Sequence, residues 1–198
     1  AKMMSRPGGD LRLAVTRGLA DRKDDPGKAL RAKAFESIRR DLEARGHRFR
    51  TGSDSEIVVH LYEEYGAQCV EHLRGEFAFV LWDERNQRLF CARDRFGIKP
   101  LYYAVVDGTF FCASEAKALL PFLPDVETDL DGLRDYLAFQ FCLAGKTMFK
   151  GVHELPPGHL LTVQNGNVRV ERYWEVEYEP DFDHTERYFV DRLRDIVD

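Results

Sequence analysis

Three cationic side chains and one carboxylate lie within seven residues of one another in this chain, at Arg93, Asp94, Arg95 and Lys99. The surrounding stretch, Leu89–Ala104, reads Leu-Phe-Cys-Ala-Arg-Asp-Arg-Phe-Gly-Ile-Lys-Pro-Leu-Tyr-Tyr-Ala. Ionised groups of this kind form charge-assisted hydrogen bonds, which is how buried charges are compensated in proteins. We therefore predict a structural role, in which the arginines and the aspartate bind one another and nearby carbonyl groups.

Apolar runs on both sides of this charged turn place it between two strands. Leu89–Ala92 precedes the turn and Leu101–Val106 follows it. Gly97 is free to adopt a positive φ, and Pro100 fixes the backbone where the second run begins. Strand, turn and strand is the predicted local structure.

Other apolar runs indicate antiparallel strands that are buried on both faces. Phe77–Trp82 is apolar at every position, which is typical of a strand covered on two sides. The connections are short enough for an antiparallel meander through Phe110–Ala113, and Asp107-Gly108 and Asn165-Gly166 predict hairpin turns. Such strands need a second sheet or an outer helical layer, so we predict an α+β fold. Further strand candidates are Leu11–Val15, His47–Thr51, Leu160–Val163 and Val168–Tyr173.

Apolar residues at helical spacing predict helices over Lys28–Arg45 and Thr185–Asp198. Gly46 stands where the first of these helices should end. Another helix should follow Asp129 as its N-cap, with its Tyr and Phe residues in the core. Cys69–Arg74 is predicted to be a short helix.

One more helix start lies at Thr51-Gly52-Ser53-Asp54-Ser55-Glu56. Ser53 and Glu56 have the spacing of a capping box. Asp54 falls in the first turn, near the positive end of the helix dipole. On the residues alone, Asp54 is expected only to complement that dipole.

Composition sets broad limits on the class of protein. The chain has 198 residues, of which 44% are hydrophobic and 32% charged, which suits one globular domain with part of a second. The net charge of −5 and the dispersed cations give no basic patch for nucleic acid. No apolar run is long enough to span a membrane and no signal peptide is visible, so we expect a cytoplasmic protein.

Two longer strings resemble a known family. Arg-Asp-Arg-Phe-Gly-Ile-Lys-Pro-Leu-Tyr-Tyr, followed by Phe-Cys-Ala-Ser-Glu-Ala-Lys-Ala-Leu, resembles the glutamine amidotransferase domain of glutamine-dependent asparagine synthetases. The resemblance runs from about Ala44 to Trp174 and implies the four-layer αββα sandwich of N-terminal-nucleophile hydrolases. It also implies that Asp54, in a matching Ser-Asp-x-Glu turn, holds the α-amino group of bound glutamine. A carboxylate suits that role because it accepts several hydrogen bonds from an ammonium group.

The chemistry that the resemblance implies is that of class II amidotransferases. An N-terminal cysteine attacks the glutamine amide, its own α-amino group acts as the base, and an Asn-Gly pair stabilises the oxyanion. The released ammonia would then amidate an aspartyl-adenylate in a second domain that uses ATP and Mg. The implied partners are L-glutamine, the synthetase domain of the same parent chain and, in a homodimer, a second copy, with no cofactor in this chain.

The sequence lacks the catalytic part of that pattern. It begins Ala1-Lys2-Met3 and contains neither Arg-Gly-Pro-Asp nor Asn-Gly-Glu-Ile-Tyr-Asn. The four internal cysteines have no ligand spacing and no free α-amino group beside them, so we expect buried thiols; they are Cys69, Cys91, Cys112 and Cys142. Cys91 and Cys112 lie in apolar strands, where the pKa of a thiol rises. We therefore expect no catalytic residue in this chain and no glutamine hydrolysis by it.

Three interpretations stay open at this point. The chain could be part of a glutamine-hydrolysing asparagine synthetase. It could instead be a non-catalytic scaffold domain of an ammonia-dependent or lactam-forming synthetase, or a related hydrolase with another acyl substrate. The expected organisation is a poorly patterned segment over 1–27, an amidotransferase-like domain over 28–174, and a linker with the first helix of a synthetase domain over 175–198.

Overall fold

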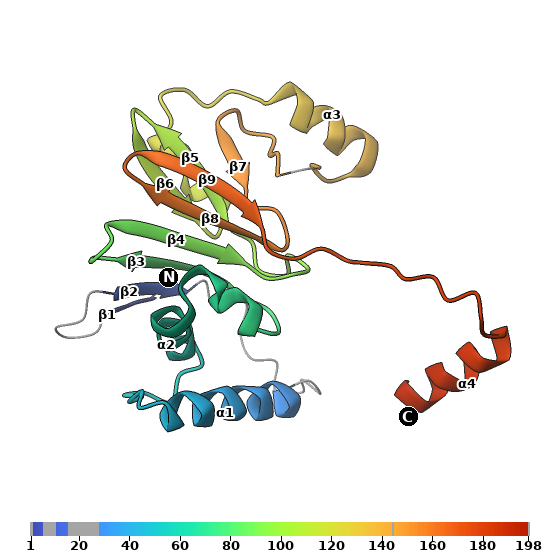
Figure 1. The fold of residues 1–198 in the computed structure, drawn as a ribbon. Helices are drawn as coiled ribbons and strands as arrows, with labels where there is room; N and C mark the ends of the chain where they lie inside the picture. Colours follow the sequence, from blue (N-terminus) through green and yellow to red (C-terminus); the bar gives the residue numbers. More distant parts are fainter. Residues whose placement is uncertain (1, 6–10, 16–27, 144, 198) are drawn as a thin grey trace.

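The computed structural model describes residues 2–5, 11–15, 28–143 and 145–197. These residues form two antiparallel sheets flanked by helices (Figure 1), which confirms the predicted α+β class. The larger sheet has the order β1-β2-β3-β4-β8-β9 and the smaller has the order β6-β5-β7. The strands are β1 Lys2–Ser5, β2 Leu11–Val15, β3 Ala78–Asp83, β4 Arg88–Arg93, β5 Tyr102–Val106, β6 Thr109–Ala113, β7 Val152–Glu154, β8 His159–Gln164 and β9 Asn167–Arg172.

The helices differ in length and regularity. They are α1 Lys28–Ala44, α2 Ser55–Tyr65, α3 Leu130–Phe139 and α4 Glu186–Val197, with 3-10 helices η1 Gly66–His72, η2 Ala116–Ala118 and η3 Leu120–Phe122. The short helix predicted over Cys69–Arg74 is present as the 3-10 helix η1, but it begins earlier, at Gly66, and ends earlier, at His72. The strand predicted at Leu11–Val15 is confirmed, and β1 is a further strand in the segment 1–27, which was expected to be poorly patterned. The remainder of the segment 1–27 lies outside the described residues.

The predicted meander is broken after β4. This strand pairs with β3 on one side and with β8 on the other, while β5 pairs with β6 and β7 in the smaller sheet. The chain therefore crosses from one sheet to the other between β4 and β5, through the charged turn. The two hairpins are as predicted, because Asp107 and Gly108 have φ of 49° and 74°, and Asn165 and Gly166 have 52° and 76°.

The larger sheet is buried on both faces, as its apolar strands predicted. On one face Phe79 and Phe90 pack with Leu61 of α2 and Leu42 of α1 in one apolar cluster. On the other face Cys91 belongs to a second cluster, which includes side chains of the smaller sheet. Burial of one large apolar side chain stabilises a fold by roughly 1.5–3 kcal/mol. The first cluster therefore holds α1 and α2 on the larger sheet, and the second holds the two sheets together.

The outer face of the smaller sheet has a different cover. Ala104 and Val152 pack there with Leu119, close to the short 3-10 helices η2 and η3. The side chain of Asp129 accepts a hydrogen bond from the backbone N–H of Gly132 at 2.8 Å, so the predicted N-cap of α3 is confirmed. The prediction that the Tyr and Phe residues after Asp129 lie in the core is wrong, because Tyr136 and Phe139 of α3 and Phe141 just beyond it are exposed.

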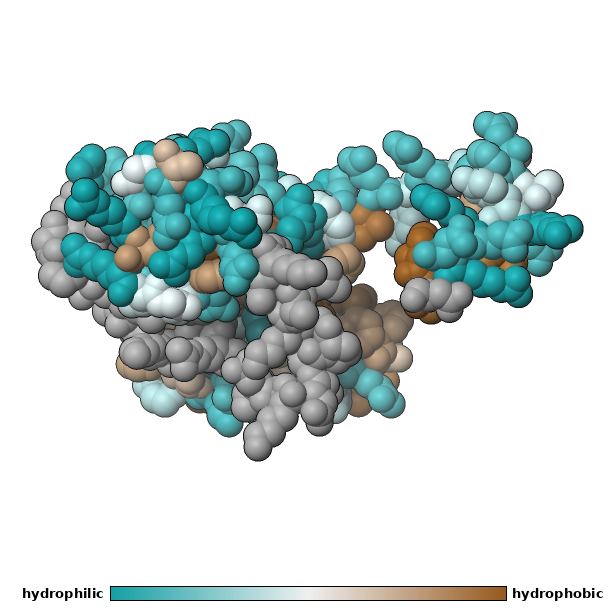
Figure 2. All heavy atoms as spheres, turned by 90° about the horizontal axis from the view of Figure 1, so that it is seen from below, coloured by the Kyte–Doolittle hydropathy of each residue, from teal (hydrophilic) through white to brown (hydrophobic). Residues whose placement is uncertain are grey.

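The segment after β9 leads away from the sheets to α4 (Figure 1). This helix confirms the predicted helical stripe, and its apolar side chains are exposed, with 62% for Leu193 and 70% for Ile196. Figure 2 shows apolar surface on α4 beside its polar surface. Within the part of the chain that the structure describes, no helix has the length and apolar character needed to traverse a lipid bilayer.

Candidate functional site

Asp94 lies at the buried centre of the turn that joins the two sheets. Its carboxylate accepts hydrogen bonds from the backbone N–H groups of Phe77, Phe96, Ile98 and Lys99, at 3.3, 3.1, 3.0 and 2.9 Å. The residue is only 1% exposed, so these four amides replace water around the carboxylate. Asp94 therefore fixes the path of the loop that follows it.

Arg93 fixes the same turn from the other side. Its guanidinium donates to the carbonyl oxygens of Lys99 at 2.9 Å, Leu155 at 2.6 Å and Gly97 at 2.7 Å. It also forms an ion pair with Glu154 at 2.8 Å. The predicted structural role of the charged turn is confirmed, although Arg93 and Asp94 bind backbone groups rather than each other.

The turn is closed so tightly that a side chain on Gly97 would not fit. Gly97 has a φ of +67°, as predicted, and a Cβ atom there would lie 2.7 Å from Cγ of Pro157. The hydroxyl of Tyr173 donates to the carbonyl oxygen of Arg93 at 2.7 Å, and burial raises the pKa of that tyrosine. The loop before β8 and the segment after β9 are thereby joined to the same turn.

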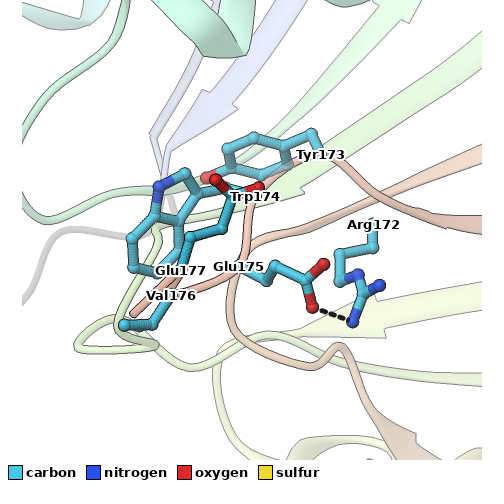
Figure 3. Close-up of a pocket in the computed structure, with 6 residues that line it drawn as sticks. All are labelled: Arg172, Tyr173, Trp174, Glu175, Val176 and Glu177. Atoms are coloured by element: carbon cyan, nitrogen blue, oxygen red, sulfur yellow. Dashed lines mark ion pairs between the residues drawn. The ribbon is translucent and has the colours of Figure 1, made fainter. Parts of the chain in front are cut away.

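A cavity of about 670 Å³ lies against the segment that leaves β9 (Figure 3), and the described residues that line it are Arg172–Glu177. The ring of Trp174 contacts Phe96, with ring centres 5.1 Å apart, and the guanidinium of Arg95 at 5.5 Å. Glu175 is already paired with Arg172 at 2.5 Å. Since the Glu175 carboxylate and the Tyr173 hydroxyl are both engaged within the protein, these two groups indicate no ligand.

Asp54, the one predicted binding residue, lies exposed just before α2. Its backbone is already helical, with φ −57° and ψ −30°, and its side chain makes no capping hydrogen bond. Among the described residues its carboxylate accepts one long hydrogen bond, from the Ser55 hydroxyl at 3.4 Å. The structure thus leaves this carboxylate available to an ammonium group.

Glu56 holds the turn that carries Asp54. Its carboxylate accepts from the backbone N–H groups of Arg50 and Thr51, both at 2.8 Å, and from the Thr51 hydroxyl at 2.6 Å. Burial raises the pKa of Glu56, but these hydrogen bonds outweigh burial and leave the pKa below its ordinary value. The predicted capping box is wrong, because Glu56 reaches past Ser53. The strand predicted at His47–Thr51 is also wrong, since the last amides of this segment bind Glu56.

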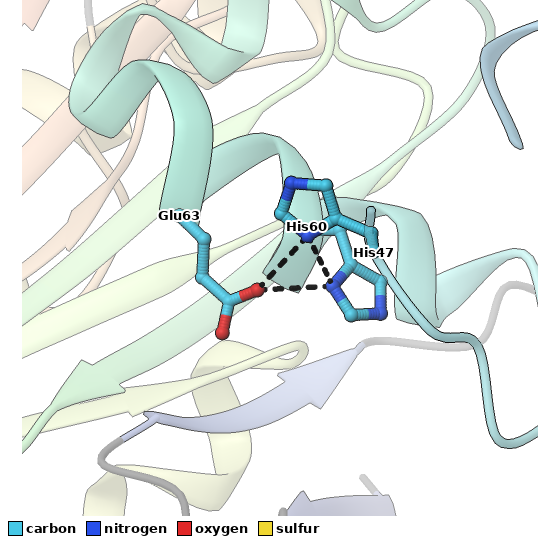
Figure 4. Close-up of side chains that lie close together, drawn as sticks. All are labelled: His47, His60 and Glu63. Atoms are coloured by element: carbon cyan, nitrogen blue, oxygen red, sulfur yellow. Dashed lines mark hydrogen bonds and ion pairs between the residues drawn. The ribbon is translucent and has the colours of Figure 1, made fainter. Parts of the chain in front are cut away.

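A second group of ionisable residues lies beside this turn and was not predicted from the sequence (Figure 4). His47, in the segment after α1, approaches His60 and Glu63 of α2 closely enough for the three to hold a metal ion. The spacing of His60 and Glu63 on one helical face was a signal in the sequence. His47, which completes the group, comes from another segment of the chain.

The cysteines are internal, and the structure shows them as free thiols. Burial raises the pKa of Cys69 to about 12. A hydrogen bond with Cys112, together with burial, raises the pKa of Cys91. The expectation of a raised pKa is wrong for Cys112, because its hydrogen bond with Cys91 lowers the pKa of that thiol.

The glutamine amidotransferase domain family matches residues 33–174 of this chain. The chain belongs to the class II glutamine amidotransferase family. The match includes Asp54 and the whole charged turn, so the resemblance that the sequence predicted is confirmed.

Curated relatives support the same assignment. The chain is 42% identical over 158 residues to "Asparagine synthetase [glutamine-hydrolyzing] 3" of Bacillus subtilis, covering 77% of this chain and 25% of that protein. It is 45% identical over 150 residues to "Amidase chyE" of Penicillium rubens, covering 75% of this chain and 22% of that protein. The chain therefore spans about a quarter of the length of the relatives that it matches.

A solved structure shows the same fold at lower sequence identity. The glutamine phosphoribosylpyrophosphate amidotransferase of B. subtilis aligns with a TM-score of 0.54 and 21% identity, covering 86% of this chain and 30% of that chain. The two-sheet fold is therefore shared with that amidotransferase.

Proposed function

We propose that this chain is the amidotransferase domain of an asparagine synthetase-type protein and that it binds L-glutamine with Asp54 holding the α-ammonium group. The parent protein would use ammonia from glutamine for the ATP-dependent amidation of aspartate. The observation that carries the proposal is the family match over 33–174 together with an exposed Asp54 carboxylate that accepts only one long hydrogen bond among the described residues. An ionised carboxylate beside a ligand ammonium forms a charge-assisted hydrogen bond.

The proposal also concerns the rest of the parent protein, because the relatives are about four times as long as the part that this chain matches. ATP and Mg would bind in a synthetase domain of the same parent chain, and no cofactor would bind in this one. The segment 175–198 would be the linker and first helix of that domain, whose surface would cover the exposed apolar stripe of α4. The amidotransferase domain would have the four-layer αββα arrangement, and the parent protein could form a homodimer.

A second function is that of a domain that does not hydrolyse glutamine. None of Cys69, Cys91, Cys112 and Cys142 has the free α-amino group that serves as base in this chemistry, because all four are internal. The domain would then act as an amidotransferase-like scaffold for an ammonia-dependent or lactam-forming synthetase. This second function predicts that the 198-residue chain releases no glutamate from L-glutamine.

The experiment that tests the binding proposal is calorimetric titration of the chain with L-glutamine. We expect Asp54→Asn to weaken binding roughly ten- to hundredfold, since a hydrogen bond to a charged group is worth about 1.5–3 kcal/mol. N-acetyl-L-glutamine has no ammonium group. It should bind the unsubstituted 198-residue chain as weakly as L-glutamine binds the Asp54→Asn variant. Asp125→Asn is the matched control, because Asp125 is also exposed. Equal affinities of the Asp54 and Asp125 variants would contradict the assignment.

The two functions are separated by a measurement of glutamate release, made on this chain and on the full-length parent. Release by the parent alone supports the glutamine-hydrolysing synthetase. Release by neither supports the scaffold. Release by the 198-residue chain would contradict the expectation that it contains no catalytic residue, and single substitutions of its four cysteines would then test each thiol as the nucleophile.

A further inference from the structure

Three ring or carboxylate atoms converge beside the turn that carries Asp54. Nδ1 of His47 lies 3.1 Å from Nδ1 of His60, and Oε2 of Glu63 lies 3.0 Å from the second ring and 3.4 Å from the first (Figure 4). We call these three residues the histidine–glutamate cluster. Each of the three atoms is a ligand that a transition-metal ion accepts.

We propose that the histidine–glutamate cluster binds one divalent transition-metal ion, and that zinc is its best match. Zinc bonds to histidine nitrogen and carboxylate oxygen are about 2.0–2.2 Å long, so two ligands of a tetrahedral zinc are roughly 3.3–3.5 Å apart. The three measured separations of 3.0, 3.1 and 3.4 Å fall just below or within that range. An increase of a few tenths of an ångström would place the three atoms at zinc-binding distance.

The hydrogen bonds around the cluster show why a cation fits between the three atoms. Nε2 of His47 lies 2.7 Å from a carboxylate oxygen of Glu64, so this nitrogen carries the ring proton when His47 is neutral. Nδ1 of His47 then has a lone pair and cannot donate. With His60 also neutral, its Nδ1–H must supply the single proton that faces both His47 and Glu63. With both rings neutral, the remaining contact, 3.4 Å between Nδ1 of His47 and the Glu63 carboxylate, joins two acceptors.

Carboxylates behind the two rings would complete such a metal site. A histidine ligand commonly donates its second ring N–H to a carboxylate, which orients the ring and increases its basicity. Glu64 already has this position behind His47. Behind His60, Nε2 is buried without a hydrogen-bond partner among the described residues and lies 3.7 Å from Oε1 of Glu56. Metal binding would move the His60 ring proton from Nδ1 to Nε2, where it would face Glu56.

Burial decides where a fourth ligand could enter. The side chain of His60 is 2% exposed, that of His47 13% and that of Glu63 24%. The open side of the cluster therefore lies toward Glu63, and a water molecule would fill the fourth position there. The metal would tie the segment after α1 to α2 and so support the turn that carries Asp54.

The test is a calorimetric titration of the untagged 198-residue chain, freed of metal by a chelator, with Zn²⁺. We expect one strongly bound zinc per chain. Loss of a residue that hydrogen-bonds a metal ligand weakens metal binding roughly 10- to 100-fold, so Glu64→Gln should weaken zinc binding within that range. His47→Gln and Glu63→Gln each remove a ligand and should weaken zinc binding by more. His184→Gln is the matched control, because His184 also lies 2.7 Å from a carboxylate, that of Asp181, but outside the cluster.

Two results would overturn the proposal. One is the absence of stoichiometric zinc binding by the unsubstituted 198-residue chain. The other is a loss of zinc affinity in His47→Gln and Glu63→Gln that is no greater than the loss in His184→Gln. Circular dichroism checks that each variant is folded. X-ray absorption spectroscopy of zinc bound to the unsubstituted 198-residue chain needs no variant and should show two imidazole ligands. A spectrum with one imidazole ligand or none would also reject the site.

Discussion

Replacing the buried carboxylate of Asp94 by an amide removes acceptors from the turn that joins the two sheets. In Asp94→Asn the side chain keeps its size, but one of its two oxygens becomes an NH₂ group, which only donates. In the unsubstituted protein one oxygen of Asp94 accepts from the backbone N–H groups of Phe96 and Ile98, and the other accepts from those of Phe77 and Lys99. Whichever way the amide is turned, two backbone N–H groups lose their acceptor and face another donor.

The expected loss follows from these two bonds. A hydrogen bond to a charged group contributes about 1.5–3 kcal/mol, so two such losses amount to roughly 3–6 kcal/mol. Asp94 is 1% exposed, so water cannot replace the lost acceptor without opening the turn. A domain of this kind has about 5–15 kcal/mol of unfolding free energy in total, so the substitution should remove a large part of it.

Urea unfolding at neutral pH, followed by the fluorescence of Trp82 and Trp174, measures this loss. Trp174 is a local reporter, because its ring contacts Arg95 and Phe96 of the same turn. Asp125→Asn is the control, and this exposed substitution should change the unfolding free energy by less than about 0.5 kcal/mol. Hydrogen exchange should show that the amide of Ile98 or that of Lys99, whichever faces the new NH₂ group, loses protection first.

A loss below about 1 kcal/mol in Asp94→Asn would refute the reasoning, because it would equal one ordinary neutral hydrogen bond. Unchanged protection of the Ile98 and Lys99 amides would refute it as well. A large loss of stability with unchanged protection at the turn would place the effect elsewhere in the fold.

Two further predictions concern the loops around the site. Gly158 has a φ of +66°, and a Cβ there would lie 2.4 Å from the carbonyl oxygen of Trp174, whereas Gly166 has a φ of +76° and open space. Gly158→Ala should therefore cost at least about 2 kcal/mol in urea unfolding and clearly more than Gly166→Ala, and equal costs would disprove the close contact. Because the pKa of Glu56 is lower in the folded state than its ordinary value of 4.5, the ionised carboxylate stabilises the fold at pH values above 4.5. This stability is lost as the pH falls through the lower pKa of the folded state. Glu56→Gln should lower stability at neutral pH and flatten its decline in acid, so an unchanged acid slope would contradict this assignment.

Local sequence patterns predicted most of the elements correctly. Asp107-Gly108 and Asn165-Gly166 form hairpins because their residues adopt positive φ readily, which is a property of the dipeptide itself. Asp129 caps α3 for a similarly local reason. The Phe77–Trp82 run predicted a strand buried on both faces, and β3 is one.

Two errors arose where the partners of a side chain or of an apolar stripe do not follow from the local pattern. The Glu56 carboxylate binds the amides of Arg50 and Thr51, and this removes both the predicted capping box and the predicted strand. Apolar residues after Asp129 recur at helical spacing, but periodicity does not show whether another element covers the stripe that they form.

By itself the sequence determined the family, the hairpins, the α+β class and the structural role of the charged turn, because each depends on residues close together in the chain. Only the tertiary structure decided that this turn crosses between two sheets, since strand pairing depends on contacts such as Arg93 with Leu155. It also decided that His47 meets His60 and Glu63. These residues meet because α1 and α2 pack together on the larger sheet, and burial of their apolar faces drives that packing.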